Sequence, residues 1–170
     1  MTEEKTSPSK SDFKAVKIDN GAWMPEIAEH IAAFCKKAHV DGLQPGNLQT
    51  YFARVAQGWY GKDAREFWMV FEDGDKPVAF ASWLIMDLPH IAKVYCCSAY
   101  SWTKDKRAFD LLMDEFIKFG EECNAVWWSS DCVSKAILRL FKAKMTKRGL
   151  QTTESGGINV VCRKINTRST

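Results

Sequence analysis

Several features that define other protein classes are missing from this sequence of 170 residues. It has no run of about 18 uncharged apolar residues, so we expect no helix that spans a membrane. Residues 1–12 are polar and include acidic side chains, so they lack the apolar segment of a secretory signal. No two cysteines form a Cys-x-x-Cys pair, and none has zinc-ligand spacing to a histidine, so we expect no metal site. These absences predict a cytoplasmic protein that does not bind a membrane.

The sequence also has little net charge, since 24 basic and 21 acidic residues give +3. A balance this even does not indicate a nucleic-acid partner. The basic residues are nevertheless concentrated in the stretches 104–107 and 135–148. We therefore expect a local basic patch, and a helix over 135–148 could face an acidic partner.

Six cysteines and seven tryptophans are unusual for this length. The cysteines are Cys35, Cys96, Cys97, Cys123, Cys132 and Cys162. Most of them lie in apolar segments, which predicts reduced and mainly buried thiols. The tryptophans in strand-like runs are explained first by core packing.

The length and the 46% content of hydrophobic residues predict one globular domain. We place this domain at 13–165, between polar tails at 1–12 and 166–170 that we expect to be disordered.

Hydrophobic periodicity predicts an alternation of strands and helices within the domain. The predicted strands are 13–18, 66–72, 77–86, 92–100, 125–129, 150–153 and 158–165, and the predicted helices are 25–38, 48–59, 109–119 and 133–141. The turn Asp73-Gly74-Asp75-Lys76 predicts an antiparallel hairpin over 66–86. A helix between 92–100 and 125–129 makes these two strands parallel neighbours. The fold class is therefore α+β, with a mostly antiparallel mixed sheet, one parallel pair and about four helices on its two faces.

This order of elements resembles the GCN5-related N-acetyltransferase (GNAT) family over 13–165. The family's cofactor loop, [Q/R]-x-x-G-x-[G/A], binds the pyrophosphate of coenzyme A through backbone N–H groups at a helix N-terminus. The pair Leu111-Leu112 resembles the family's paired leucines and places this loop on residues 103–108. Of these residues, only Ala108 fits the motif.

The resemblance implies a cofactor site made from the strand 92–100 and the following loop. The residues that it assigns to coenzyme A are Cys96, Cys97, Ser98, Thr103, Lys104, Lys106, Arg107, Ala108 and Ser134. The pantetheine arm would lie along Cys96 to Ser98, and the basic side chains of the loop could attract phosphate, whereas Asp105 would oppose it. Ser134 stands near the family's asparagine at the start of the fourth helix.

The resemblance also implies where the chemistry would occur. Ser98 and Tyr100 would flank the thioester, and we take them as the candidate catalytic residues. Phe141 stands where the family has a tyrosine that protonates the leaving thiolate, and phenylalanine cannot donate a proton. The strand 92–100 has no carboxylate, so Asp131 is a candidate for holding a water, or else it caps the fourth helix.

Three functions remain open. The first is an acyl-CoA-dependent N-acyltransferase that transfers the acetyl group of acetyl-CoA to a small-molecule or protein amine. The second is a GNAT-like protein without catalysis that binds or assembles with a protein partner, as a component of a bacteriophage virion or of host takeover. The third is a GNAT-related enzyme that modifies a nucleic acid or a protein lysine with another acyl donor, since the run PVAFASW resembles the hairpin of toxin-activating lysine acyltransferases that use acyl carrier protein.

Overall fold

The computed structural model describes residues 11–40, 47–88, 91–132, 134–155 and 159–164. This part of the chain contains seven strands and four helices in the predicted order. They are β1 Phe13–Ile18, α1 Met24–Val40, α2 Leu48–Trp59, β2 Arg65–Glu72, β3 Lys76–Leu88, β4 Ile91–Ser101, α3 Lys106–Glu122, β5 Trp127–Asp131, α4 Lys135–Lys147, β6 Leu150–Ser155 and β7 Asn159–Lys164. Within the described residues, no helix is both long and apolar enough to cross a bilayer.

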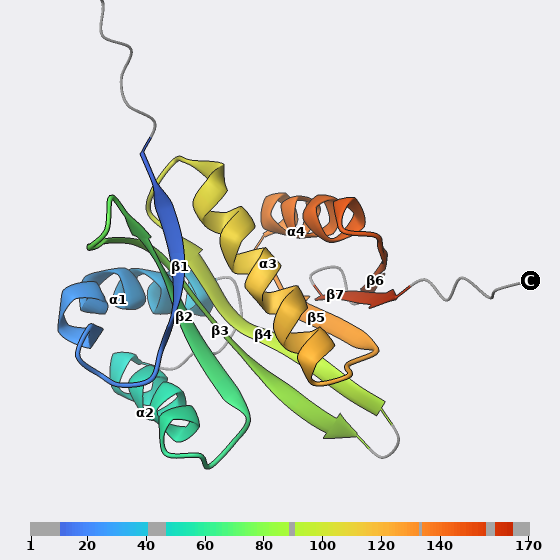
Figure 1. Cartoon of the computed structure of the whole chain (residues 1–170), viewed down its shortest axis with the longest axis horizontal. Helices are drawn as coiled ribbons and strands as arrows, with labels where there is room; N and C mark the ends of the chain where they lie inside the picture. Colours follow the sequence, from blue (N-terminus) through green and yellow to red (C-terminus); the bar gives the residue numbers. More distant parts are fainter. Residues whose placement is uncertain (1–10, 41–46, 89–90, 133, 156–158, 165–170) are drawn as a thin grey trace, which may run out of the picture.

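The strands form one mixed sheet in the order β1-β2-β3-β4-β5-β7-β6 (Figure 1). β4 and β5 pair in parallel, from Lys93 opposite Trp127 to Cys96 opposite Ser130. The other five strand pairs are antiparallel. The predicted α+β class, the single parallel pair and the four helices are therefore confirmed.

The helices cover the two faces of the sheet, and each face has its own core. α1 and α2 pack on one face, where Ile27, Ile31 and Val55 meet apolar side chains of β2 and β3. α3 crosses the other face, and α4 lies beside it over the β5–β7–β6 end of the sheet (Figure 1). Phe116 of α3 and Phe141 of α4 are packed together there, with ring centroids 6.2 Å apart. The apolar stripes of the sequence thus face the sheet, as amphipathic helices require.

Polar side chains fix where three helices begin. Asn47, Asp105 and Ser134 each accept a hydrogen bond from a backbone N–H of the first turn, in α2, α3 and α4 respectively. The suggestion that Asp131 caps α4 is wrong, because Ser134 is the cap and Asp131 ends β5.

β5 begins two residues later than predicted. Asn124 has a positive φ of 53° and ends the turn after α3, and the Val126 N–H then donates to the carbonyl of Ala92 before the strand begins. β5 continues through Ser129 and Ser130, which are buried although they are polar. Alternation of apolar residues could not reveal a strand end built from serines.

The N-terminal end of the domain extends slightly into the predicted N-terminal tail. The Asp73 N–H donates to the carbonyl of Asp12, and the Asp12 N–H donates to the Asp73 carboxylate. Residues 1–10 and 166–170 of the predicted tails lie outside the described residues, as do position 165 at the end of the predicted domain and position 133, where the fourth helix was predicted to begin.

Candidate active site

β4 contains a bulge at the point where it separates from β5. Trp83 of β3 lies opposite Cys96, and Ser82 lies opposite Ser98, so Cys97 is the extra residue of β4. The parallel ladder with β5 ends at Cys96 and Ser130, whereas β4 continues to Ser101. Beyond this point the edge of β4 that faces β5 has no strand partner among the described residues. Its backbone N–H and C=O groups can therefore bind an extended ligand.

A cleft of about 680 Å³ lies at this separation. α1, α2 and β3 line one side of it, and α3, α4 and β5 line the other. Because β4 crosses between the two sides, a ligand on either side would meet the bulged segment of β4.

Most of the residues that the resemblance assigned to a site line this cleft. They are Cys96, Cys97, Ser98, Tyr100, Thr103, Lys104 and Lys106. The structure does not bring the other three to its wall. Ala108 is a fully buried residue of α3, Ser134 caps α4, and Arg107 borders a separate cavity of about 290 Å³ with Asp12 and Phe13.

Ser98 is held between two other hydroxyl groups. Its Oγ lies 2.7 Å from the Tyr51 hydroxyl and 2.8 Å from Ser82 Oγ, and all three residues are buried. Burial raises the pKa of the Tyr51 hydroxyl above its usual range, so this group stays protonated and can donate. Sequence reasoning did not identify this contact of Tyr51. Only the distance between α2 and β4 could have revealed it.

A second polar contact bridges the separating strands. The Tyr95 hydroxyl of β4 donates to the Asp131 carboxylate at the end of β5, with 2.5 Å between the two oxygens. Both residues line the cleft. Burial, and then the hydrogen bond to Asp131, raise the pKa of Tyr95, so Tyr95 remains a neutral donor. Of the described residues, Asp105 and Asp131 are the carboxylates that line the cleft, and Asp131 lies nearer the bulge in the register of the sheet.

The bulged thiol of Cys97 faces an arginine. Arg65 Nη1 lies 3.5 Å from Cys97 Sγ, and the same guanidinium pairs with Asp63 at 3.3 Å. Burial nevertheless raises the pKa of Cys97 to about 11, against the opposing charges of Arg65 and Arg54. Cys97 is therefore a thiol rather than a thiolate at neutral pH, and it lacks the character of an activated nucleophile.

Two aromatic residues of the predicted site also lie on the cleft wall. Phe141 is 2% exposed and offers only its ring, so it cannot supply the proton that the resemblance assigns to this position. The ring of Tyr100 packs against Phe34, Phe80 and Trp102. Tyr100 is thus fixed in place beside the bulge.

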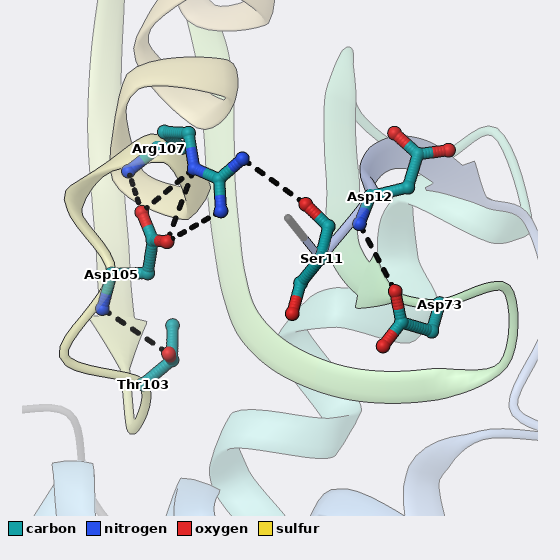
Figure 2. A network of polar contacts seen from close by, with 6 residues as sticks. All are labelled: Ser11, Asp12, Asp73, Thr103, Asp105 and Arg107. Carbon is teal, nitrogen blue, oxygen red and sulfur yellow. Dashed lines mark hydrogen bonds and ion pairs between the residues drawn. The ribbon is translucent and has the colours of Figure 1, made fainter. Parts of the chain in front are cut away.

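The N-terminus of α3, predicted to bind pyrophosphate, is occupied by the chain's own side chains (Figure 2). The Asp105 carboxylate accepts from the Arg107 N–H at 2.9 Å, and the Asp105 N–H donates to Thr103 Oγ1 at 3.2 Å. The Arg107 guanidinium also binds the Asp105 carboxylate, at 2.7 Å from Nη2. This arrangement places a negative charge where the diphosphate of coenzyme A would need N–H donors, so the diphosphate does not fit the loop as it is folded. Beyond Cys96, in contrast, the edge of β4 that faces β5 has no strand partner among the described residues, so its backbone groups are available to an extended arm.

The basic patch predicted for α4 is neutralised only in part, because ion pairs engage three of the six cations of 135–148. Lys142 pairs with Glu154 at 2.6 Å, Lys144 pairs with Asp110, and Arg148 pairs with Asp114. Because these cations are already paired, α4 offers less positive charge to an acidic partner than its sequence indicates.

Comparison with known proteins identifies the fold. No protein-family model matches the sequence, and no curated protein sequence matches it. Solved structures do match. An acetyltransferase of the GNAT family from Staphylococcus aureus Mu50 superposes with a TM-score of 0.59 at 11% identity, covering 89% of this chain and 99% of that one. The chain has the GNAT fold.

Two further GNAT-fold structures agree with this assignment. The PaiA N-acetyltransferase of Thermoplasma acidophilum, in complex with coenzyme A, gives a TM-score of 0.61 at 13% identity over 91% of this chain and 99% of that one. The GCN5-related glucosamine N-acetyltransferase region of a fungal multi-domain GH3 β-N-acetylglucosaminidase gives 0.62 at 11% identity over 90% of this chain. This chain spans only 18% of that fungal enzyme.

Proposed function

We propose that this protein is an N-acyltransferase that transfers an acyl group from a pantetheine thioester to an amine. The observation that carries the proposal is the bulge at Cys97, placed where β4 leaves β5 and where the cleft opens to both faces of the sheet. Such a site lets a thioester approach β4 from one side and an amine approach it from the other. The amine acceptor would be a small molecule or a protein side chain, and the compartment would be the cytoplasm.

The donor that we propose is acetyl-CoA, which supplies an activated acyl group. The backbone of Cys96, Cys97 and Ser98 would hold its pantetheine arm along the unpaired edge of β4. A backbone N–H of the bulge would donate to the thioester carbonyl oxygen and stabilise the negative charge that develops there. Orientation of the two reactants in the cleft would supply much of the rate.

The side chains near the bulge would transfer protons and position the thioester. Asp131 would bind the amine and take up its proton, directly or through a water, as the new C–N bond forms. Ser98 and Tyr100 would flank the thioester carbon, with Ser98 oriented by Tyr51 and Ser82. Tyr95 donates to Asp131, so the proton that Asp131 takes from the amine would pass through the Tyr95 hydroxyl to the thiolate sulfur when the C–S bond breaks, and both side chains would regain their starting protonation states.

The test is the release of free thiol from acetyl-CoA with a panel of amines. Wild-type protein should release thiol in an amine-dependent way, and Asp131→Asn should lower kcat at least about 100-fold, in the range of general acid–base catalysis. Asp75→Asn is a matched control, because Asp75 is exposed in the β2–β3 turn. Full activity of Asp131→Asn would overturn the assignment of the base, and no amine-dependent release from any donor would overturn the function.

Two observations favour a second candidate, a GNAT-fold binding or assembly protein without catalysis, as a virion component would be. Phe141 cannot donate a proton, and the Asp105 carboxylate occupies the Arg107 N–H at the start of α3. If this second candidate is correct, neither acetyl-CoA nor acetyl-pantetheine should raise the melting temperature of the protein. If the protein is an N-acyltransferase, at least one of these two thioesters should raise the melting temperature, because a ligand that binds the native state stabilises it.

A further inference from the structure

The loop before α3 is closed around Asp105 by several independent contacts. The Asp105 carboxylate accepts from the Arg107 backbone N–H and from two nitrogens of the Arg107 guanidinium, Nε and Nη2, at distances between 2.7 and 3.1 Å. An aspartate at this position also interacts favourably with the positive end of the helix dipole. The carboxylate therefore occupies the position that an anionic ligand of this helix would take.

Arg107 is fixed on the side of the loop that faces away from the cleft. Its Nη1 donates to the carbonyl of Ser11 at 3.1 Å, and its guanidinium lies over the ring of Phe13, 4.7 Å from the centroid. Figure 2 shows Arg107 between Asp105 and the start of β1. A diphosphate that displaced the Asp105 carboxylate would break the ion pair between Asp105 and Arg107. The arginine is thus a partner of Asp105 rather than a ligand for phosphate.

We infer that Asp105 makes this protein select its donor by the pantetheine arm and discriminate against the diphosphate. This inference rests on the proposed function, since it concerns the donor of the same reaction. A diphosphate at the helix terminus would have to displace the Asp105 carboxylate from the Arg107 N–H and guanidinium, and it would then lie beside a like charge. Lys104 and Lys106 line the cleft, but their ammonium groups sit on flexible stems and offer the diphosphate only screened attraction. Binding energy for the donor must then come from β4.

The prediction that separates this donor site from an ordinary diphosphate site is a ratio of affinities. Acetyl-CoA and acetyl-pantetheine share the thioester and the arm, and only acetyl-CoA has the phosphates. Wild-type protein should bind the two with dissociation constants within about threefold of each other. Removing the charge of Asp105 should make the dissociation constant of acetyl-CoA smaller than that of acetyl-pantetheine.

The experiment measures both dissociation constants by calorimetry on wild-type protein and on Asp105→Asn. Asparagine retains the cap, because its side-chain oxygen can still accept from the Arg107 N–H. Asp105→Asn should bind acetyl-CoA about tenfold more tightly and bind acetyl-pantetheine unchanged. Asp114→Asn is the matched control. It removes the same charge from α3 nine residues further along, roughly 13 Å by helix rise, and should change neither constant by more than about twofold.

Each outcome decides the inference. A wild-type preference for acetyl-CoA above about tenfold would overturn it, and so would an unchanged acetyl-CoA affinity in Asp105→Asn. If wild-type protein binds neither thioester but Asp105→Asn binds acetyl-CoA, the donor assignment of the proposed function fails while the role of Asp105 stands. If neither the wild-type protein nor Asp105→Asn binds either thioester, both the proposed donor and the proposed role of Asp105 are wrong. Circular dichroism and melting temperature identify a variant that has lost its fold, and Asp105→Ser, which also retains the cap, then replaces it.

Discussion

The hydroxyl oxygens of Tyr51 and Ser98 lie 2.7 Å apart and join α2 to β4 one residue beyond the bulge. Ser98 is also 2.8 Å from Ser82, so its hydroxyl has a defined direction. A buried hydroxyl with two partners loses little freedom during a reaction. The helix on one face of the sheet thereby fixes a polar group beside the proposed thioester.

Tyr51→Phe should therefore reduce activity more than it reduces donor binding. The change removes one partner of Ser98 and keeps the ring in its packing position against Phe34 and Phe80. We expect kcat to fall about tenfold with the acetyl-CoA dissociation constant unchanged, and the free energy of unfolding to fall by about 1 kcal/mol. Steady-state kinetics and urea unfolding measure these changes. Tyr60→Phe, at an exposed tyrosine, is the control, and an unchanged kcat in Tyr51→Phe would show that the hydroxyl chain is only structural.

The overall architecture could be predicted because the residues that build it follow simple periods. The aromatic-rich strands around Asp73 and Gly74 indicated the hairpin, and the spacing of Leu112, Phe116 and Phe119 indicated α3. The end of β5 could not be predicted, since Ser129 and Ser130 are polar residues that are buried in a strand paired on both sides.

The candidate site was less predictable, because it depends on contacts between distant segments. The extra residue at Cys97 is defined by the register with β3, which the sequence of β4 alone does not contain. Tyr51 carries an apolar ring and a polar hydroxyl. Hydrophobic periodicity predicts that the ring is packed in the core but does not predict the partner of the hydroxyl. Asp105 was identified from sequence as an opposing charge, but its bond to Arg107 required the loop geometry.

Tyr95→Phe should lower kcat about tenfold, because Tyr95 donates to the carboxylate that we propose as the base. The loss should be smaller than in Asp131→Asn, since the carboxylate itself remains. Single-turnover kinetics with saturating acetyl-CoA measure the effect, and thermal unfolding monitors the fold. The double variant should be no slower than Asp131→Asn alone if Tyr95 acts through Asp131. Additive losses would indicate that the two residues act independently.

Stability should decrease in alkaline solution because buried thiols resist ionisation. Burial raises the pKa of Cys132 to about 11 and that of Cys162 to about 12, whereas an unfolded cysteine titrates near ~8.5. Between these pH values the native state holds more protons than the unfolded state, so the free energy of unfolding falls as pH rises. The slope should be about 1.4 kcal/mol per pH unit for each such thiol. Urea unfolding from pH 7 to 10.5 measures it, and Cys132→Ala should show a shallower slope. A constant free energy up to pH 10 would contradict the prediction.

Gly58→Ala should destabilise the protein although alanine favours helices. A Cβ at Gly58 would lie 2.6 Å from the carbonyl oxygen of Arg65, so α2 would have to move away from β2. This displacement should cost about 1–3 kcal/mol and outweigh the helix propensity gain of about 1 kcal/mol. Because α2 also carries Tyr51, kcat should fall together with the melting temperature. Gly21→Ala is the matched control, since its Cβ would meet Trp59 at an ordinary 3.5 Å. A Gly58→Ala protein that melts at a higher temperature than the wild type would show that α2 and β2 are not in close contact.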